Sequence, residues 1–154
     1  GGGTALYDAI YFACRDKLMK GGQAGPVRRA IVLLSDGEDN QSRVSREQAI
    51  EMAERAEVII YAISTNSTGY REHGDKVMER MAELTGGRAF FPFKIEDVAN
   101  AFAEIQEELR SQYAISYHPA SFANDGAYHS IDITVINRKN LKVRSRKGYS
   151  APKQ

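Results

Sequence analysis

The sequence has a single cysteine, no tryptophan and no long apolar run. The one thiol, Cys14, excludes an internal disulfide framework and a zinc site built from cysteines. No apolar stretch reaches the roughly 18 residues from which a membrane-spanning helix is inferred, so we expect no membrane span. The chain begins Gly-Gly-Gly-Thr and lacks a starting Met or a signal-peptide pattern. We therefore expect it to be cut from something longer, which leaves its compartment open.

The sequence also lacks an excess of either charge, because it has 21 Lys and Arg and 20 Asp and Glu, which gives a net charge of +1. That balance argues against a dedicated nucleic-acid-binding protein. The charges are nevertheless unevenly placed, since residues 133–154 hold seven of the bases and none of the acids. Lys142, Arg144 and Arg146 alternate with apolar residues, so this basic tail predicts mainly a solvated strand face. A patch that binds a polyanion is the alternative.

The apolar residues that are present divide most of the chain into helices and strands. Short apolar runs predict buried strands over 29–35, 57–63 and 88–91. Helical periodicity predicts helices over 4–20, 45–56, 75–84 and 95–111. Ser45 with Gln48 predicts a capping box at the start of the second, and Thr85-Gly86-Gly87 a C-cap at the end of the third. Thr4 is expected to cap the first helix and Gly21-Gly22 to end it. This alternation of helix and strand implies a parallel sheet with right-handed crossovers.

After Gln112 the apolar pattern changes to the alternation of strands. Three strands are predicted, over residues 113–117, 131–135 and 141–143, with a turn at 137–140 that joins the last two. The fold class expected is α/β: a doubly wound, Rossmann-like, mainly parallel sheet with helices on both faces, plus a small C-terminal antiparallel β element. The expected division is a body over 1–111 and a β extension over 112–154.

Two oxygen-bearing side chains fall where α/β proteins place their sites, at strand ends and helix starts. Thr4 follows a Gly-rich loop that opens a helix, and Asp36 follows the strand ending at Ser35. A hydroxyl and a carboxylate are hard donors that suit Mg²⁺ or Ca²⁺ if others join them. The alternatives are structural: Thr4 as a helix cap, and Asp36 as a turn residue that bonds to local backbone.

Two segments favour the interpretation of Thr4 and Asp36 as metal ligands. GGTALYDAI (residues 2–10) and AIVLLSDGEDN (residues 30–40) closely resemble the second and third motif segments of the von Willebrand factor type A domain. The later elements through Leu109 are similar to that family's remaining strand–helix pairs. The ending, LRSQY (109–113) through RKGY (146–149), is similar to bacterial, acidobacterial-type proteins described as von Willebrand factor A-related.

The resemblance implies a metal-ion-dependent adhesion site on a non-enzymatic, protein-binding module, extracytoplasmic in location. In that family Asp-x-Ser-x-Ser after the first strand, a Thr and an Asp surround one divalent cation, and an acidic side chain of a protein partner completes the shell. Thr4 and Asp36 match the Thr and the Asp. Asp-x-Ser-x-Ser is absent and would precede Gly1. We therefore expect Mg²⁺ or another divalent cation in an intact protein and weak or no binding here.

The missing first strand has a second implication, because it is normally central to the family's sheet. Without it, the strand containing Ile31 to Leu34 has an unpaired flank that invites self-association. Weaker candidates for partner contact are Gly3 and Gly37 beside the metal residues, and Tyr70 with Arg71 in the loop after the second strand. Glu38 and Asp39 either modulate the site or merely solvate the turn.

The remaining reactive residues receive no catalytic role. Cys14 lies near an apolar helix stripe and is interpreted as a buried small side chain. His73 is assigned to a solvated loop, and His118 and His129 lack a third ligand at metal spacing. Two other functions stay open: an enzyme that uses the Gly-rich loop and Asp36 for phosphate or metal chemistry, and a structural domain of a larger envelope or secreted protein. No phosphate loop with Lys and no Gly-x-Ser-x-Gly elbow supports the enzyme.

Overall fold

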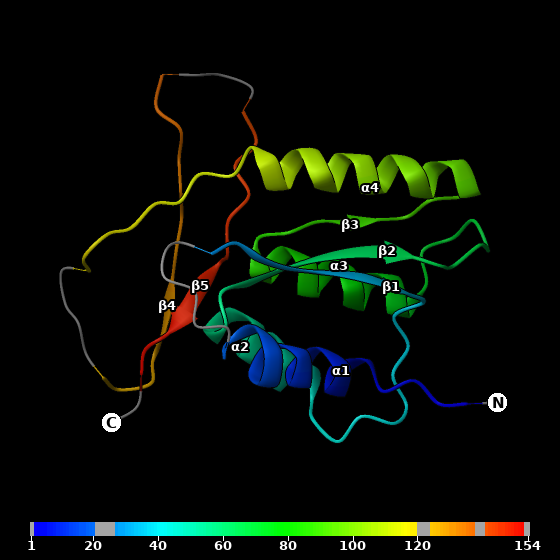
Figure 1. Cartoon of the computed structure of the whole chain (residues 1–154), viewed down its shortest axis with the longest axis horizontal. Helices are drawn as coiled ribbons and strands as arrows, with labels where there is room; N and C mark the ends of the chain where they lie inside the picture. The colour runs from blue at the N-terminus through cyan, green and yellow to red at the C-terminus, as the bar shows by residue number, and fades with distance from the viewer. Residues whose placement is uncertain (1, 21–26, 120–123, 138–140, 153–154) are drawn as a thin grey trace.

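A parallel sheet forms the centre of the molecule (Figure 1). The computed structural model describes residues 2–20, 27–119, 124–137 and 141–152. The sheet contains β1 (Arg29–Ser35), β2 (Val58–Ser64) and β3 (Ala89–Phe90) in the order β1-β2-β3. Its register sets Arg29 opposite Val58 and Ser35 opposite Ser64. The expected parallel α/β architecture is confirmed.

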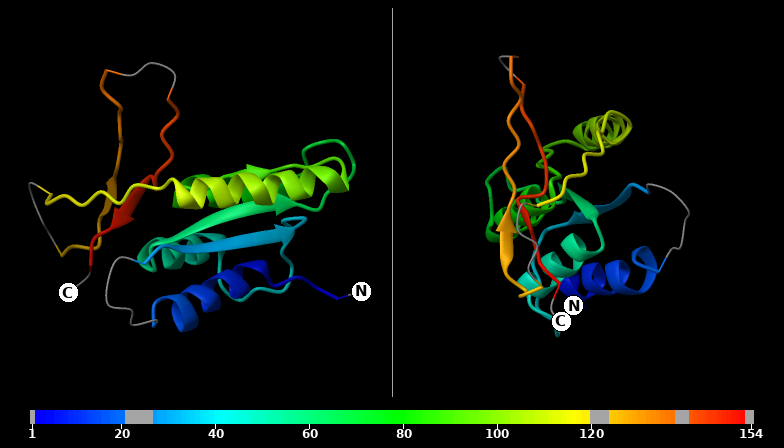
Figure 2. Two further views of the ribbon diagram at one scale, coloured as in Figure 1. Left: turned by 45° about the horizontal axis from the view of Figure 1, so that its top comes forward. Right: turned by 90° about the vertical axis from the view of Figure 1, so that its left-hand side faces the viewer.

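Helices cover both faces of this sheet, as expected (Figure 2). They are α1 (Leu6–Phe12), which continues into the π-helix η1 (Ala13–Leu18), then α2 (Arg46–Arg55), α3 (His73–Thr85) and α4 (Ile95–Arg110). Side chains of α1, α2 and α3 pack on one face with Val58 and Ile60 of β2. Ala101 and Ile105 of α4 pack on the other face with Tyr61 and Ile63. No helix in the described ranges is long and apolar enough to cross a membrane.

The N-terminal helix differs from its prediction in two respects. Its second half is a π-helix, and its N-cap is Ala5, which makes no side-chain capping hydrogen bond. The expectation that Thr4 caps the helix is therefore wrong: the backbone of Thr4 is bonded to a loop far along the sequence instead. The predicted stop at Gly21-Gly22 lies outside the described residues.

The caps of α2 and α3 follow from local sequence. At α2, the Ser45 hydroxyl accepts a hydrogen bond from the Gln48 N–H, and the Gln48 side chain accepts one from the Ser45 N–H, so the predicted capping box is confirmed. At the end of α3, Gly86 adopts a left-handed conformation with φ 86°, which glycine reaches without strain. The expected C-cap is therefore also confirmed.

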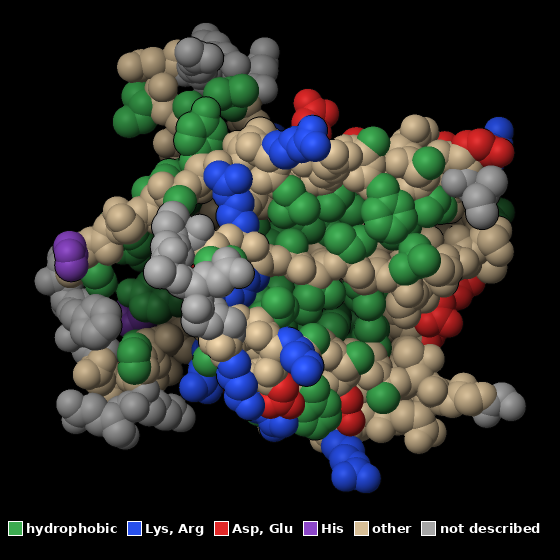
Figure 3. All heavy atoms as spheres, viewed as in Figure 1, with side chains coloured by type: hydrophobic (Ala, Val, Ile, Leu, Met, Phe, Trp, Pro, Cys, Tyr) green, Lys and Arg blue, Asp and Glu red, His purple; other side chains and the backbone are tan. Residues whose placement is uncertain are grey.

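β1 lies at the edge of the sheet, and one of its faces is only partly covered. The side chain of Val32 is 41% exposed and that of Leu34 is 55% exposed. Both lie on the face that α4 covers, but the cluster under α4 is built on β2 and β3. The prediction that this strand is buried on both faces is therefore wrong. Figure 3 shows the result, with hydrophobic side chains on both sides of the β1 backbone.

The C-terminal segment forms a small antiparallel element, but with fewer strands than predicted. β4 (Tyr128–Ser130) pairs with β5 (Gly148–Ser150), and Gly148 lies opposite Ser130. None of the three predicted ranges 113–117, 131–135 and 141–143 is a strand. Their alternating apolar side chains find no face to bury, since Tyr113, Ile115 and Leu141 are exposed. The turn predicted at 137–140 lies outside the described residues except for Asn137.

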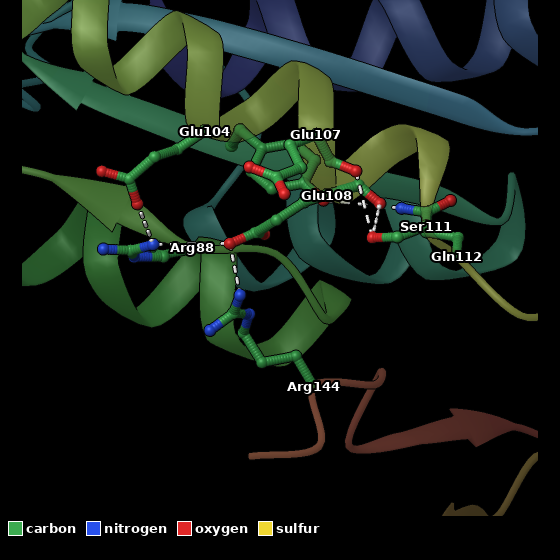
Figure 4. A network of polar contacts seen from close by, with 8 residues as sticks. Arg88, Glu104, Glu107, Glu108, Ser111, Gln112 and Arg144 are labelled. Atoms are coloured by element: carbon green, nitrogen blue, oxygen red, sulfur yellow. Dashed lines mark hydrogen bonds and ion pairs between the residues drawn. The ribbon is translucent and has the colours of Figure 1, made fainter. Parts of the chain in front are cut away.

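The C-terminal segment is attached to the body by backbone and ionic contacts. The Lys147 N–H donates to the Leu84 carbonyl at 3.1 Å. The Arg144 guanidinium pairs with Glu108 of α4, and Arg88 bridges Glu104 at 2.6 Å and Glu108 at 3.4 Å (Figure 4). Arg144 is exposed, and its place in a surface ion-pair network is a contact that the prediction of a mainly solvated basic face did not include.

Candidate functional site

Polar side chains gather where the parallel strands end. Ser35 closes β1, Ser64 closes β2, and the register sets these two serines side by side. Asp36 follows β1 directly. The carboxyl ends of parallel strands open on one edge of a sheet, where α/β folds hold their ligands. We therefore take this edge as the candidate site.

Asp36 lies at the surface of this edge with its carboxylate partly engaged. Its Oδ1 accepts the N–H of Glu38 at 3.1 Å, and the neighbouring Ser35 hydroxyl accepts the N–H of Gly37, also at 3.1 Å. Oδ2 has no hydrogen bond among the described residues. The turn thus fixes the carboxylate and leaves one oxygen toward solvent.

Thr4 is held against the loop that follows Asp36. Its N–H donates to Asn40 Oδ1 at 3.0 Å, and its carbonyl accepts the N–H groups of Asn40 at 3.0 Å and Gln41 at 3.1 Å. Gly3 is packed so closely that an added Cβ would lie 2.1 Å from Gln41 Cγ. The backbone of Thr4 is therefore fixed, and its hydroxyl makes no hydrogen bond among the described residues.

Two aspartates clamp the start of α1 onto the same loop. Asp39 Oδ2 accepts the Tyr7 N–H at 2.9 Å and the Ser42 hydroxyl at 2.6 Å. Asp8 Oδ1 accepts the N–H groups of Arg43 and Val44, each at 3.0 Å. Burial by itself would raise the pKa of Asp39, but the hydrogen bonds from Ser42 and Tyr7 lower it below its ordinary value. Asp39 therefore positions the two loops and does not merely solvate the turn.

The turn after β1 also packs against the start of α3. Gly37 has φ 80° and is buried, and an added Cβ there would lie 2.2 Å from the Gly74 carbonyl oxygen. Glu38 Oε1 accepts the Gly74 N–H at 3.1 Å. Gly37 is thus a point of close backbone approach. Glu38 likewise ties two elements together, which the interpretation as a solvating residue missed.

A buried carboxylate lies beneath this contact. Asp75, in the first turn of α3, is 2% exposed. Its Oδ1 accepts the Ser64 hydroxyl at 2.5 Å, and its Oδ2 accepts Asn66 Nδ2 at 3.1 Å and the Glu72 N–H at 3.0 Å. Burial works to raise the pKa of Asp75, and these hydrogen bonds from Ser64, Glu72 and Asn66 outweigh it and lower the pKa.

The interpretation of Asp75 with His73 as part of a solvated loop is wrong, because Asp75 is buried, and one signal in the sequence indicates its role. Glu72 and Asp75 have the spacing of a capping box, and both halves of that box form at the start of α3. His73 and Gly74, assigned to a loop from the sequence, belong to α3 as well. With three hydrogen bonds from protein groups, Asp75 joins the end of β2 to the start of α3.

Tyr70 and Arg71 lie beside this cluster with two aromatic residues. The guanidinium of Arg71 lies 3.5 Å from the centre of the Phe91 ring and pairs with Glu79 at 2.7 Å. Tyr70 is 83% exposed and Phe93 69% exposed. Together with Ser64, Asn66, Gly69 and Asp75 they line a hollow of about 50 Å³. The structure thus joins Tyr70 and Arg71 to the carboxyl edge of the sheet, with an aromatic surface that the sequence reasoning did not include.

The oxygens of Thr4 and Asp36 are the kind of donor that a hard cation prefers, but two donors are fewer than such a cation needs. Mg²⁺ takes about six oxygens in octahedral geometry. Among the described residues no group of three or more His, Cys, Asp and Glu is arranged to hold a metal ion. The residues described here therefore do not form a complete metal site.

Other candidate residues have structural surroundings. Cys14 is fully buried, as the interpretation of a buried small side chain expects, and burial raises the pKa of its thiol to about 11. His129 stacks on Tyr149 with ring centres 5.2 Å apart.

A second hollow, of about 450 Å³, lies between α2, α3 and the β4–β5 pair, and its lining includes Glu54, Arg80 and Tyr128.

Comparisons with known proteins add little to this geometry. No protein-family model matches the chain, and no curated protein matches it either. Among solved structures it is similar to an uncharacterized membrane spanning protein from Vibrio fischeri, with a TM-score of 0.46 and 21% sequence identity. That match covers 53% of this chain and 47% of the other, so the chain spans less than half the length of that structure.

Proposed function

We propose that the chain is a non-enzymatic protein-binding module of the von Willebrand factor A type. In this proposal Thr4 and Asp36 contribute two oxygens to a divalent-cation site, and the other donors come from a strand ending in Asp-x-Ser-x-Ser and from an acidic side chain of the partner. The cation would supply a positive centre for that acidic group. The proposal includes an extracytoplasmic location, which follows from the resemblance alone.

One observation carries the proposal: the two loops that hold Thr4 and Asp36 are fastened to each other. Thr4 is bonded to Asn40 and Gln41, which lie in the loop that Asp36 opens. Asp39 and Asp8 add a second layer of bonds between the same segments. The two candidate donors are therefore held on segments that are bonded to each other.

The exposed aromatic residues support a protein partner over a small substrate. Tyr70 and Phe93 are largely exposed beside the candidate site, and aromatic side chains with arginine are enriched at protein interfaces. The hollow beside them is about 50 Å³, which is far below the roughly 300 Å³ typical of small-molecule pockets. An interface around this edge therefore suits the surface better than an enclosed active site does.

Calorimetric titration of Mg²⁺ and Mn²⁺ tests the proposal. The cation should bind weakly or not at all to this chain, and tightly to a chain extended at its N-terminus by a strand ending in Asp-x-Ser-x-Ser. Asp36→Ala should abolish binding by the extended chain, whereas Asp97→Asn, at an exposed position in α4, should not change it. Tight binding by this chain, or none by the extended chain, would contradict the proposal.

A further inference from the structure

The hollow lined by Tyr70 and Phe91, which we name the aromatic hollow, lies beside the turn that carries Asp36. Ser64, at the end of β2, also lines it and is the register partner of Ser35. Phe91 follows directly after β3. The aromatic hollow therefore opens at the ends of the two strands next to β1, on the same edge of the sheet as the candidate metal residues.

Two charged side chains line the aromatic hollow, and both are already paired within the protein. Arg71 donates two hydrogen bonds to the Glu79 carboxylate, at 2.7 and 3.2 Å, while its guanidinium lies on the Phe91 ring. Asp75 is buried and accepts three hydrogen bonds from protein groups. A charged ligand group would have to break one of these pairings to be compensated here, so the aromatic hollow favours an uncharged, apolar side chain.

The aromatic hollow has room for one small side chain. Its volume of about 50 Å³ is roughly three to five times the 10–15 Å³ that holds one water molecule. That space suits the branched end of a valine, isoleucine or leucine but not an indole ring. Tyr70 and Phe93 are largely exposed in its wall, so such a side chain would bury part of their apolar surface, which stabilises a complex.

The spacing of the strands sets how far the aromatic hollow lies from Asp36. Neighbouring strands are about 4.8 Å apart. Asp36 follows β1, and the aromatic hollow lies between the ends of β2 and β3, so the two are about 7 Å apart across the edge. Side chains on one face of an extended segment recur at every second residue, about 6.6 Å apart. An extended segment laid across the strand ends therefore brings residues i and i+2 to these two places.

We propose that the partner binds through an extended segment in which an acidic residue and a valine, isoleucine or leucine are two positions apart. The inference rests on the proposed function, because the acidic residue is the one that meets the cation held with the help of Thr4 and Asp36. The apolar residue fills the aromatic hollow between Tyr70 and Phe93. The cation makes binding metal-dependent, and the aromatic hollow selects the sequence of the partner.

Selection from a displayed library of random short peptides tests the inference. The N-terminally extended chain is loaded with Mg²⁺, and bound peptides are released with EDTA, which recovers cation-dependent binders. The released peptides should carry Asp or Glu with Val, Ile or Leu two positions away. On Tyr70→Ala the acidic residue should persist without the apolar preference. Tyr113→Ala is the matched control and should retain both, because this exposed tyrosine lies beyond α4 at the opposite end of the sheet (Figure 1).

Affinities of a selected peptide separate this inference from the proposed function. Replacing its apolar residue with alanine should weaken binding to the wild type about tenfold, and to Phe93→Ala less than about twofold. Mg²⁺ should bind both proteins equally. An apolar preference at another spacing, none at all, or one that persists on Tyr70→Ala and Phe93→Ala would overturn the inference and leave the proposed function standing. A Mg²⁺-loaded chain that yields no EDTA-released peptide would contradict the protein-binding function and the inference with it.

Discussion

The Ser64 hydroxyl donates a 2.5 Å hydrogen bond to the buried carboxylate of Asp75 and so fastens the end of β2 to the first turn of α3. Asp75 also bonds to Asn66 and to the Glu72 backbone. The start of α3 in turn meets the turn that holds Asp36, through Gly74 and Glu38. The arrangement of the candidate site therefore depends on this buried acid.

Asp75→Asn should destabilise the protein markedly. The amide keeps the size of the carboxylate but replaces charge-assisted hydrogen bonds and leaves a buried polar mismatch, for a loss of about 2 kcal/mol in the free energy of unfolding. Chemical denaturation measures that loss. Asp97→Asn at an exposed position is the control and should change stability by less than about 0.5 kcal/mol. Equal effects of the two variants would show that the buried network contributes nothing.

Acid should unfold the protein through the same group. Since folding lowers the pKa of Asp75 and of Asp39 below the ordinary 3.8, the folded state favours their charged forms. Their stabilisation is fully present above the ordinary pKa and is lost as pH falls through the lowered folded values. Denaturation curves recorded over a falling pH series should show the wild type and Asp75→Asn converging in stability. A constant difference at all pH values would contradict this assignment.

Asp39→Ala should loosen the start of α1 from the loop after β1. The variant removes the acceptor for the Tyr7 N–H and for Ser42, so the Tyr7 amide should exchange with solvent faster while core amides such as that of Ile60 keep their protection. Hydrogen exchange measured by NMR reads both amides. If the exchange of Tyr7 were unaltered, the clamp would not hold these two segments together.

Arg144→Ala should have only a small effect, although Arg144 pairs with Glu108 in a network with Arg88. The side chains are partly solvated, and such pairs contribute about 1 kcal/mol or less. Faster proteolysis after Ser111 should accompany that small loss, because the pair attaches the C-terminal segment to α4. Lys142→Ala, a neighbouring exposed base without an ion pair among the described contacts, should alter neither quantity.

Local sequence patterns were sufficient for most of the body. The apolar run from Ala30 to Leu34 predicted β1, and Ser45 with Gln48 predicted the start of α2, because both signals act over a few residues. The C-terminal strands were not predicted correctly. Alternating side chains such as Tyr113 and Ile115 define a strand only if a surface covers one face, and whether that surface exists is a property of the tertiary structure.

The candidate site was predictable in part. Thr4 and Asp36 were found because motif segments carry them. The positioning roles of Asp39 and Asp75 were not predicted, since they depend on partners such as Tyr7 and Ser64 that are distant in sequence or lie on another element. The exposure of Val32 was missed for a related reason, because composition alone does not say which strand lies at an edge.

Line broadening by Mn²⁺ in the extended chain tests most directly whether Thr4 and Asp36 share one cation. The proposed site predicts that the backbone amides of Thr4 and of Asp36 to Gly37 broaden together at the lowest metal concentration, before any other amide, and that Asp36→Ala removes the effect. Broadening that begins elsewhere, such as at the glutamates of α2, or that affects only one of the two loops, would contradict it.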